Sequence, residues 1–269
     1  MEGFELVDAG DGRRLERFGD YLVDRPAPGA WLPRQAPQAW AEADLTFDRD
    51  GGWKGDGLTQ ARAGWTIRIH DLTMDLRPTD AGQLGVFPEH PATLPWLIER
   101  VAAREQPNVL NLFGYTGLTT LALARAGAAV AHVDAARSAI AWARRNADRN
   151  GLADRPIRWL VDDARAFVAR EIRRDRRYDG VVLDPPTYGH GTGGRAWQLE
   201  RNLDPLMTDI RRVLAPDGFV ILTTHSESID PGSIGAFLGA GAEVGELSLT
   251  ATSGAVLTLG AFARVDGRA

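Results

Sequence analysis

Between residues 109 and 224 the chain alternates short apolar runs with longer amphipathic segments, and this alternation constrains the fold more than any other feature. The apolar runs predict strands and the amphipathic segments predict helices. Strands are expected at residues 109–112, 130–133, 157–161, 180–183 and 219–224. Helices are expected at residues 92–105, 117–125, 138–150, 164–173 and 203–214. Strands that alternate with helices imply a parallel sheet with helices on both faces and right-handed crossovers.

The two ends of the chain differ from this pattern. Residues 242–249 and 255–265 flank Ser253-Gly254, which is typical of a hairpin, so the last strand is expected to run antiparallel to its neighbour. Residues 1–77 are rich in Gly, Pro, Trp and Asp, with short apolar stretches that predict a small β-rich domain. The predicted fold class is therefore α/β: a seven-stranded, mostly parallel, doubly wound Rossmann-like sheet in residues 92–269, a connector at residues 78–91 and the small N-terminal domain.

The composition excludes several classes of protein. The chain has no cysteine, so it forms no disulfide, thiolate metal site or cysteine nucleophile. Its five histidines show no metal-ligand spacing, and no metal is expected. No apolar run approaches the roughly 20 residues that span a bilayer, and no leader pattern opens the chain, so a cytoplasmic location without a membrane is expected. The formal net charge of −5 argues against nonspecific binding to polyanions. Nothing in the pattern indicates the oligomeric state.

Three successive expected strands end in residues suited to holding a small ligand. Gly114 and Gly117 follow the first strand, where glycine lets the backbone approach a ligand and the next helix offers amide donors. Asp134 closes the second strand, about twenty residues after Gly114, the spacing at which a carboxylate meets ribose hydroxyls in nucleoside-binding α/β folds. Asp163 follows the third strand and can accept a hydrogen bond from an adenine amino group; Asp162 is the alternative.

Each of these features also has an ordinary structural interpretation. A Gly-x-x-Gly turn is common, and an aspartate after a strand most often caps the next helix. Their joint occurrence on three successive strand ends favours a nucleoside site. Because the turn lacks the Gly-x-Gly-x-x-Gly pattern of pyrophosphate binders, a nucleoside without phosphates is favoured over NAD or FAD.

The fourth strand ends in Asp184-Pro185-Pro186-Thr187-Tyr188, a second constellation. The prolines make the loop rigid, Asp184 can accept a hydrogen bond from a substrate N–H or from a cofactor amino group, and Tyr188 can stack on a planar base. The alternative is a rigid turn with a buried tyrosine. Glycines in residues 189–194 predict a mobile flap, in which His190 is either a base or simply a polar residue. Because parallel strand ends face one crevice, a cofactor turn beside a substrate loop points to methyl transfer from S-adenosylmethionine.

At these residues the chain resembles the class I S-adenosylmethionine-dependent methyltransferases. More narrowly, it is similar to bacterial large-subunit ribosomal RNA methyltransferases of the cytosine-C5 and guanine-N7 types. The resemblance covers about residues 92–224 and rests on residues 108–117, Asp134, residues 162–163 and residues 184–188. The segment Gly85-Val-Phe-Pro-Glu-His90 also looks like one that precedes the catalytic domain in some members.

The resemblance implies roles for individual residues. Around the methionine part of the cofactor it puts five residues, namely Phe113, Gly114, Tyr115, Thr116 and Gly117. It further implies that Asp134 holds the ribose and that Asp163 reads the adenine. Asp184 and Pro185 would lie beside the methyl group, and Phe87 would close over the cofactor. We therefore assign Asp184, Pro185 and Tyr188 to the catalytic site.

The expected function is methylation of a base nitrogen of ribosomal RNA. Cytosine-C5 transfer needs a cysteine that adds to the base, and this chain has none. The Asp-Pro-Pro-Thr-Tyr loop is one residue longer than the Asp-Pro-Pro-Tyr loop of enzymes that methylate exocyclic amines. RNA as the partner follows from the resemblance. The alternatives are a small-molecule or protein substrate, which the acidic charge suits, and a non-catalytic module that binds S-adenosylmethionine.

Overall fold

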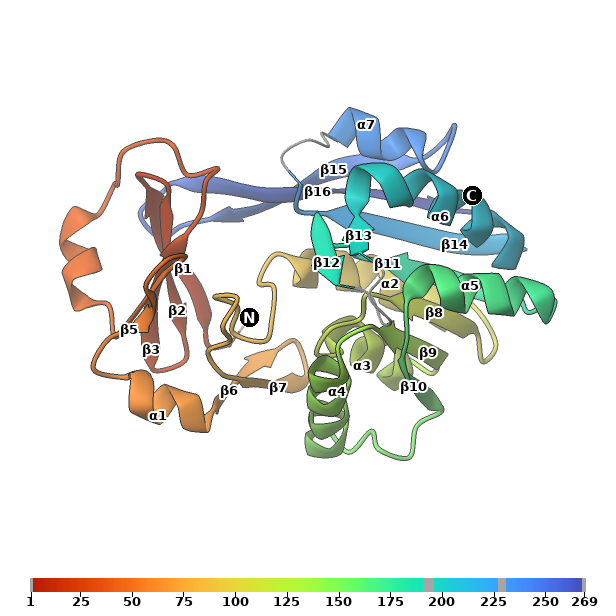
Figure 1. Ribbon diagram of the computed structural model, residues 1–269, viewed down its shortest axis with the longest axis horizontal. Coiled ribbons are helices and arrows are strands. Elements are labelled where there is room, and N and C mark those ends of the chain that lie inside the picture. The colour runs from red at the N-terminus through yellow and green to blue at the C-terminus, as the bar shows by residue number, and fades with distance from the viewer. Residues whose placement is uncertain (1, 191–195, 227–230, 268–269) are drawn as a thin grey trace. The chain divides into compact units, whose positions relative to one another are not determined.

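The computed structural model describes residues 2–190, 196–226 and 231–267 (Figure 1). The chain divides into two compact units. The N-terminal unit consists of Met1–Pro91 and Ser248–Leu259, and the α/β unit consists of Ala92–Leu247 and Gly260–Ala269. The ends of the last two strands thus group with the N-terminal residues, although the sequence had assigned all of residues 92–269 to one domain.

The α/β unit is built on a seven-stranded sheet in the order β10-β9-β8-β11-β14-β16-β15. The strands are β8 (Asn108–Leu112), β9 (Ala129–Asp134), β10 (Ile157–Val161), β11 (Tyr178–Leu183), β14 (Leu214–Thr224), β15 (Glu243–Thr250) and β16 (Val256–Asp266). Pairs from β10 to β14 are parallel, and β16 runs antiparallel to β14. The predicted fold class, including the antiparallel last strand, is confirmed.

Helices connect these strands as the alternation predicts. They are α2 (Leu94–Ala102), α3 (Leu118–Arg125), α4 (Arg137–Arg149), α5 (Ala164–Arg173), α6 (Leu199–Val213) and α7 (Pro231–Ala236), with the 3-10 turn η2 (His90–Thr93) before α2. Helix α6 begins four residues earlier than predicted, because its buried face already starts at Leu199 and continues through Leu203 and Leu206. None of the helices in the described ranges has both the length and the apolarity that crossing a bilayer requires.

One large apolar cluster joins α5 and α6 to the middle of the sheet. Phe167 of α5 and Ile210 of α6 are buried in it together with Leu112 of β8 and Leu183 of β11. Each of these side chains is at most 2% exposed. The two central strands are therefore held from one face by a continuous core, and the turns that follow them start from fixed positions.

The N-terminal unit contains a five-stranded sheet and a separate two-stranded hairpin. The sheet follows chain order: β1 (Phe4–Gly10), β2 (Arg13–Phe18), β3 (Tyr21–Pro26), β4 (Leu45–Asp48) and β5 (Gly52–Lys54). The hairpin is formed by β6 (Trp65–Ile69) and β7 (Leu72–Leu76), and the unit also has η1 (Pro37–Glu42) and α1 (Leu58–Ala63). Strands β1 and β2 escaped prediction because charged residues occupy buried positions in them, which disguises the strand pattern.

Asp8 of β1 is such a buried charge, with no exposed surface. Its carboxylate accepts hydrogen bonds from Trp40 Nε1 at 2.8 Å, Ala36 N at 2.9 Å and Ser253 Oγ at 2.7 Å. Burial alone would raise the pKa of Asp8, but these hydrogen bonds outweigh it and hold the pKa below its ordinary value. The carboxylate therefore joins three segments that are distant in sequence.

We predict that Asp8→Asn lowers the free energy of unfolding by about 1.5–3 kcal/mol, since an amide replaces a charged acceptor of several hydrogen bonds. Urea denaturation measures the change. Asp11→Asn is the matched control, because the Asp11 side chain is 59% exposed and its replacement should cost less than about 0.5 kcal/mol. Equal losses in the two variants would contradict a special role for Asp8.

Candidate active site

The carboxyl ends of the parallel strands lie along one edge of the sheet. Leu112 of β8 is in register with Val133 of β9 on one side and with Leu183 of β11 on the other. Val161 of β10 is in register with Asp134. The structure therefore brings the predicted glycine turn, the carboxylates after β9 and β10 and the prolines after β11 to neighbouring positions of one edge.

The turn after β8 has a strained backbone. Phe113 and Tyr115 have φ angles of 58° and 48°, and Gly117 has a φ of 92°. A side-chain-bearing residue in this left-handed region costs on the order of 1–3 kcal/mol and persists only where the surroundings hold it. Strain of this kind gathers at ligand sites, so the turn is a feature that points to binding.

Three contacts hold the turn in this conformation. A Cβ on Gly114 would lie 2.5 Å from the ring of His132, so the backbone and that ring pack too closely for any other residue. The Asp134 carboxylate accepts hydrogen bonds from Tyr115 N at 2.9 Å and from Ala136 N at 2.8 Å. Asn146 of α4 donates from Nδ2 to Thr116 O at 2.9 Å.

His132 lies fully buried beneath the turn. Asn111 Nδ2 donates to Thr120 Oγ1 at 2.8 Å, which leaves the Thr120 hydroxyl proton for His132 Nδ1, also 2.8 Å away. Residues of β8, α3 and β9 are thus joined in one polar chain. Burial lowers the pKa of His132 to about 3, so the imidazole is neutral at ordinary pH and can accept at Nδ1.

The low pKa of His132 makes stability depend on pH. Between pH 6.5 and about 3 the unfolded chain binds a proton at this residue and the folded chain does not, so the free energy of unfolding falls as the pH falls through that range. We predict that His132 accounts for a loss of about 2 kcal/mol between pH 7.5 and pH 5. Urea denaturation of His132→Gln should show a pH-dependent loss smaller by that amount. An NMR titration midpoint for His132 near 6.5 would contradict the assignment.

The carboxylates at this edge already have protein partners. Burial raises the pKa of Asp134, and the hydrogen bonds from Ala136 and Tyr115 oppose this. Asp163 is 4% exposed and caps α5 by accepting from Ala166 N at 3.1 Å, while Arg165 Nη2 lies 2.9 Å from its other oxygen. Burial favours a raised pKa for Asp163, but these hydrogen bonds prevail and lower it. Asp162 pairs with Arg170.

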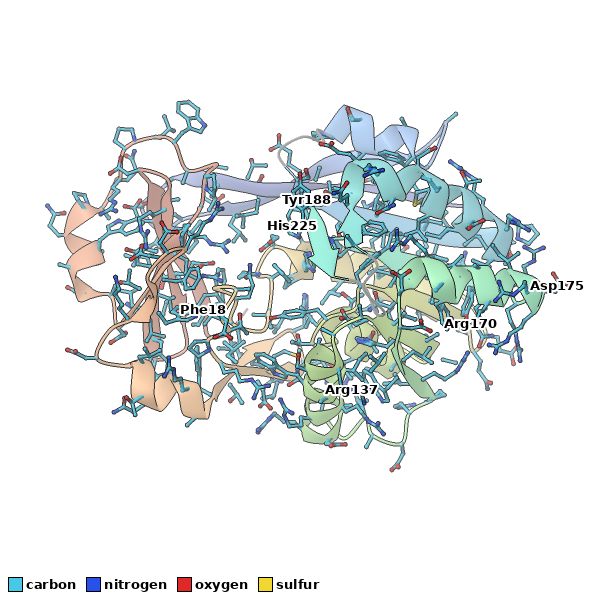
Figure 2. All side chains as sticks on the ribbon, in the orientation of Figure 1. Phe18, Arg137, Arg170, Asp175, Tyr188 and His225 are labelled. Atoms are coloured by element: carbon cyan, nitrogen blue, oxygen red, sulfur yellow. The ribbon has the colours of Figure 1, made fainter. Side chains whose placement is uncertain are left out.

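The substrate loop begins with a half-buried aspartate. Asp184 Oδ1 accepts a hydrogen bond from Thr223 Oγ1 at 2.6 Å and lies 3.4 Å from His225 Nε2. Pro185 is buried. Tyr188 is 72% exposed and opens β12 (Tyr188–His190), which pairs with β13 (Ala196–Gln198). The alternative of a buried tyrosine therefore does not hold. Tyr188 and His225 are both labelled in Figure 2. Most of the expected flap, residues 191–194, lies outside the described residues, as does the His190 side chain.

Trp197 of β13 connects the cofactor turn to the substrate loop. Its Nε1 donates to Pro186 O at 2.6 Å, and its buried ring lies 4.9 Å from the ring of Phe113. The guanidinium of Arg165, which pairs with Asp163, lies 5.7 Å from the Trp197 ring. The ends of β8, β10 and β11 are thus linked through one indole.

The sequence reasoning did not single out Trp197, Thr223 or His225. Thr223 and His225 lie at the end of β14, next to β11, so extending the strand-end rule to the expected strand at residues 219–224 would have found them. Trp197 offers no such signal, because it follows a glycine-rich segment and its contacts with Phe113 and Arg165 join it to distant parts of the chain. Phe87 belongs to the N-terminal unit, where its ring lies 5.3 Å from that of His90.

We predict that Trp197→Phe lowers the free energy of unfolding by about 1–2 kcal/mol, because the ring is kept but the Pro186 carbonyl loses its donor. Urea denaturation measures this. Trp159→Phe is the matched control, since Trp159 is half-buried in the same unit and no hydrogen bond of its indole is found in the described part of the chain. A smaller loss in Trp197→Phe than in Trp159→Phe would show that the indole N–H does not hold the loop.

Comparisons with known proteins assign the family. A family of S-adenosylmethionine-dependent methyltransferases matches residues 53–238. This chain belongs to that family. It is therefore an enzyme whose methyl donor is S-adenosylmethionine, as the strand-end constellations predicted.

Individual relatives agree with this assignment. The crystal structure of the S-adenosylmethionine-dependent methyltransferase from Agrobacterium tumefaciens has a TM-score of 0.93 and 35% sequence identity, covering 99% of this chain and 91% of that one. The structure of SMU.776, described as a methyltransferase complexed with SAH, shares the fold with a TM-score of 0.75 and 18% identity, over 98% of this chain and 76% of that one.

A curated relative is the ribosomal RNA large subunit methyltransferase K/L of Methylococcus capsulatus. It is 34% identical over 145 residues, which are 52% of this chain and 19% of that protein. The chain thus matches about a fifth of the length of this relative.

The chemistry of the site fits S-adenosylmethionine. Asp134 and Asp163 offer oxygen acceptors for the hydroxyl and amino donors of a nucleoside, and the chain has no pyrophosphate loop beside them. Each carboxylate has about four lone-pair positions, so the hydrogen bonds that it already accepts leave capacity for a ligand. The adjacent aromatic rings of Phe113 and Trp197 suit a positively charged sulfur.

Proposed function

We propose that this methyltransferase modifies a base nitrogen of ribosomal RNA. The observation that carries the proposal is Tyr188, an aromatic side chain that is 72% exposed and directly follows Asp184-Pro185-Pro186-Thr187 at the carboxyl edge of the sheet. A base that has left its stack needs an aromatic face to stack on and polar groups to bind its edge. Tyr188 and Asp184 supply these two kinds of contact on one rigid loop.

The cofactor residues follow the same proposal. Residues 113–117 surround the methionine part, Asp134 binds the ribose hydroxyls and Asp163 the adenine amino group, with Asp162 as the alternative. When bound, S-adenosylmethionine supplies a methyl group on a positively charged sulfur, so the protein needs chiefly to align the nucleophile and exclude water.

A nitrogen is favoured as the methylated atom. Carbon-5 of cytosine becomes nucleophilic through addition of a cysteine, and this chain contains none. A ring nitrogen with a lone pair needs no such activation. If the nitrogen carries a proton, Asp184 of the loop and His225, which follows β14, are the polar groups that can bind it. Thr223 holds the Asp184 carboxylate in place at 2.6 Å.

Ribosomal RNA as the substrate is supported by the relatives named ribosomal RNA large subunit methyltransferase K/L, from Methylococcus capsulatus and from Magnetococcus marinus, at 34% and 30% identity. The formal net charge of −5 favours a second candidate, a small molecule or a protein, because an acidic chain does not attract polyanions over its whole surface. The substrate classes are separable by experiment.

The test is transfer of tritiated methyl groups from S-adenosylmethionine to RNA, protein and small-molecule fractions of a strain that lacks this protein, followed by nucleoside mass spectrometry. We expect label in large-subunit ribosomal RNA, on a base nitrogen. Label confined to protein or to small molecules would overturn the RNA proposal and favour the second candidate.

In the same assay, Tyr188→Ala should slow methyl transfer about tenfold or more, because stacking on an aromatic ring is worth about 1–3 kcal/mol per base. Tyr188→Phe is the matched variant and should retain most of the activity, since the stacking face remains. The cofactor affinity, measured by calorimetry, should stay nearly unchanged in both. A collapse of cofactor affinity in Tyr188→Ala would instead place Tyr188 in the cofactor pocket.

A further inference from the structure

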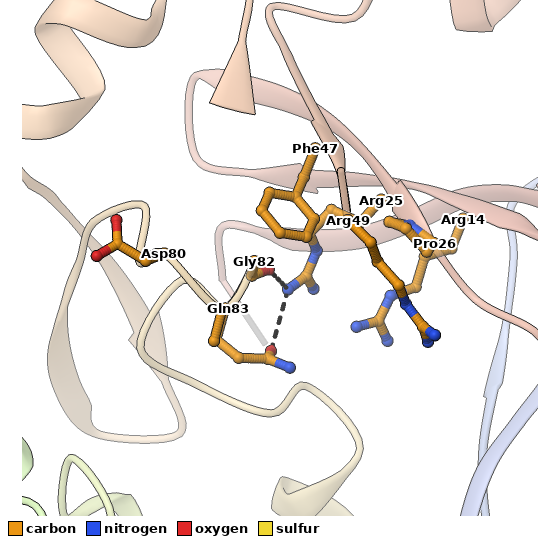
Figure 3. Close-up of a pocket in the computed structure, with 9 residues that line it drawn as sticks. Arg14, Arg25, Pro26, Phe47, Arg49, Asp80, Gly82 and Gln83 are labelled. Atoms are coloured by element: carbon orange, nitrogen blue, oxygen red, sulfur yellow. Dashed lines mark hydrogen bonds between the residues drawn. The ribbon is translucent and has the colours of Figure 1, made fainter. Parts of the chain in front are cut away.

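A cavity of about 370 Å³ lies within the N-terminal unit, lined only by residues of that unit (Figure 3). Its volume falls in the range of about 300–1,000 Å³ that is usual for small-molecule sites. Three arginines line it, Arg14, Arg25 and Arg49, together with the ring of Phe47. Nothing derived above for methyl transfer uses these residues.

Arg25 forms a wall of the cavity and has its donors occupied. It is 2% exposed, and its Nε and Nη2 donate to Glu16 Oε2 at 2.8 and 2.6 Å. Its Nη1 donates to Gly82 O at 3.0 Å and to Gln83 Oε1 at 3.3 Å. Glu16 and Glu89 both contribute negative charge to its surroundings. Arg25 thus holds the segment around Gly82 against β3 and has little left to offer a ligand.

Arg14 is different, because it shares its carboxylate partner, Glu16, with Arg25. It is 8% exposed, and its Nε lies 3.3 Å from the Glu16 oxygen that already accepts two hydrogen bonds from Arg25. In the part of the chain that the structure describes, Arg14 Nε has no hydrogen-bond acceptor. Glu16 therefore compensates the charge of Arg14 only in part, and an anion in the cavity would interact favourably with the remaining charge of the guanidinium.

Arg49 adds a second guanidinium at the same cavity. It is exposed, and within the described ranges no carboxylate pairs with it. Figure 3 shows the guanidinium groups of Arg14 and Arg49 extending to the same side of the cavity. The carboxylate that lines the cavity belongs to Asp80, which points away from both arginines in Figure 3. Three of the residues that line the cavity are arginines and one is an aspartate, so the lining carries a net positive charge.

We propose that this cavity binds a phosphate group through Arg14 and Arg49, and that the phosphate belongs to the backbone of the RNA substrate. The planar guanidinium fork matches phosphate oxygens in pairs, which makes arginine the side chain suited to this anion. Phosphate contacts of this kind position an RNA without reading its sequence. The assignment to RNA rests on the proposed function, whereas the assignment to phosphate rests on the cavity alone. A local basic site also explains how an acidic chain holds a polyanion.

The phosphate assignment is tested by titrating the full chain with inorganic phosphate and following the NMR signals of the arginine Nε–H groups. We expect saturable shifts of the Arg14 and Arg49 signals, and none with chloride at equal ionic strength. Arg49→Gln should weaken phosphate binding at least fivefold. Arg62→Gln is the matched control, because Arg62 is an exposed arginine of α1 that does not line the cavity, and it should bind as the unmodified chain does.

Arg14 is tested with Arg14→Lys, which keeps the positive charge beside Glu16 while removing the guanidinium fork. The urea denaturation curve of Arg14→Lys shows whether this variant is folded. If it is unfolded, Arg49→Gln tests phosphate binding instead, because Arg49 is an exposed residue. Saturable shifts of equal affinity in Arg49→Gln and Arg62→Gln would overturn the proposal, as would the absence of any saturable shift in the unmodified chain.

The RNA assignment is tested by binding of large-subunit ribosomal RNA over a range of salt concentrations. Arg49→Gln should lower the affinity and reduce the slope of log K against log salt concentration by about 0.7–0.9, the value for one lost phosphate contact, whereas Arg62→Gln should not. Phosphate binding with unchanged RNA binding in Arg49→Gln would assign the cavity to a free phosphorylated molecule and overturn the RNA half. The phosphate titration does not depend on methyl transfer. Its result therefore remains valid even if the protein does not methylate ribosomal RNA.

Discussion

The contact of Trp197 with Phe113 and Pro186 is the interaction on which the arrangement of the active site depends. The ring of Phe113 belongs to a strained turn, and the carbonyl of Pro186 belongs to a loop whose prolines have no backbone N–H to donate. A buried indole satisfies that carbonyl and covers Phe113 at the same time. The cofactor turn and the substrate loop are thereby held by one side chain, so their separation does not depend on either loop alone.

Beneath this contact the turn packs on a series of neutral polar groups, in addition to its hydrogen bond to the Asp134 carboxylate. Asn111, Thr120 and His132 are buried and hydrogen-bonded in series, and burial keeps the histidine uncharged. The N-terminal unit differs, because the polar groups that it buries are charged. Its small sheet buries the charged side chains Asp8, Glu16 and Arg25, where Asp8 accepts a hydrogen bond from Trp40 and Glu16 accepts from Arg25. Arg14 is a further buried charge of this sheet; it shares Glu16 with Arg25 and lines the cavity.

The strands and helices of the α/β unit were predictable because each follows from local periodicity. Helix α5 has the predicted bounds, and helix α4 ends at the predicted stop, where Gly151 has a φ of 64°. Strands β1 and β2 were not predictable by the same means. Buried charges such as Asp8 and Glu16 look like surface residues until their partners are known. The partner of Glu16 is Arg25 on the next strand, and Trp40, which binds Asp8, lies outside the sheet. The early start of α6 has a similar cause, since Leu199 belongs to the buried face.

The order of residues along the chain was enough to determine which side chains end up at the carboxyl edge of the sheet. In a parallel sheet every strand end meets the same edge, so Gly114, Asp134 and Asp184 reach it whatever the packing around them. Tertiary structure alone decided which groups support them and where a further anion site lies. Thr223 meets Asp184, and Arg14 and Arg49 come to line one cavity, only when the chain has folded, because these segments are too far apart in sequence to leave a periodic signal.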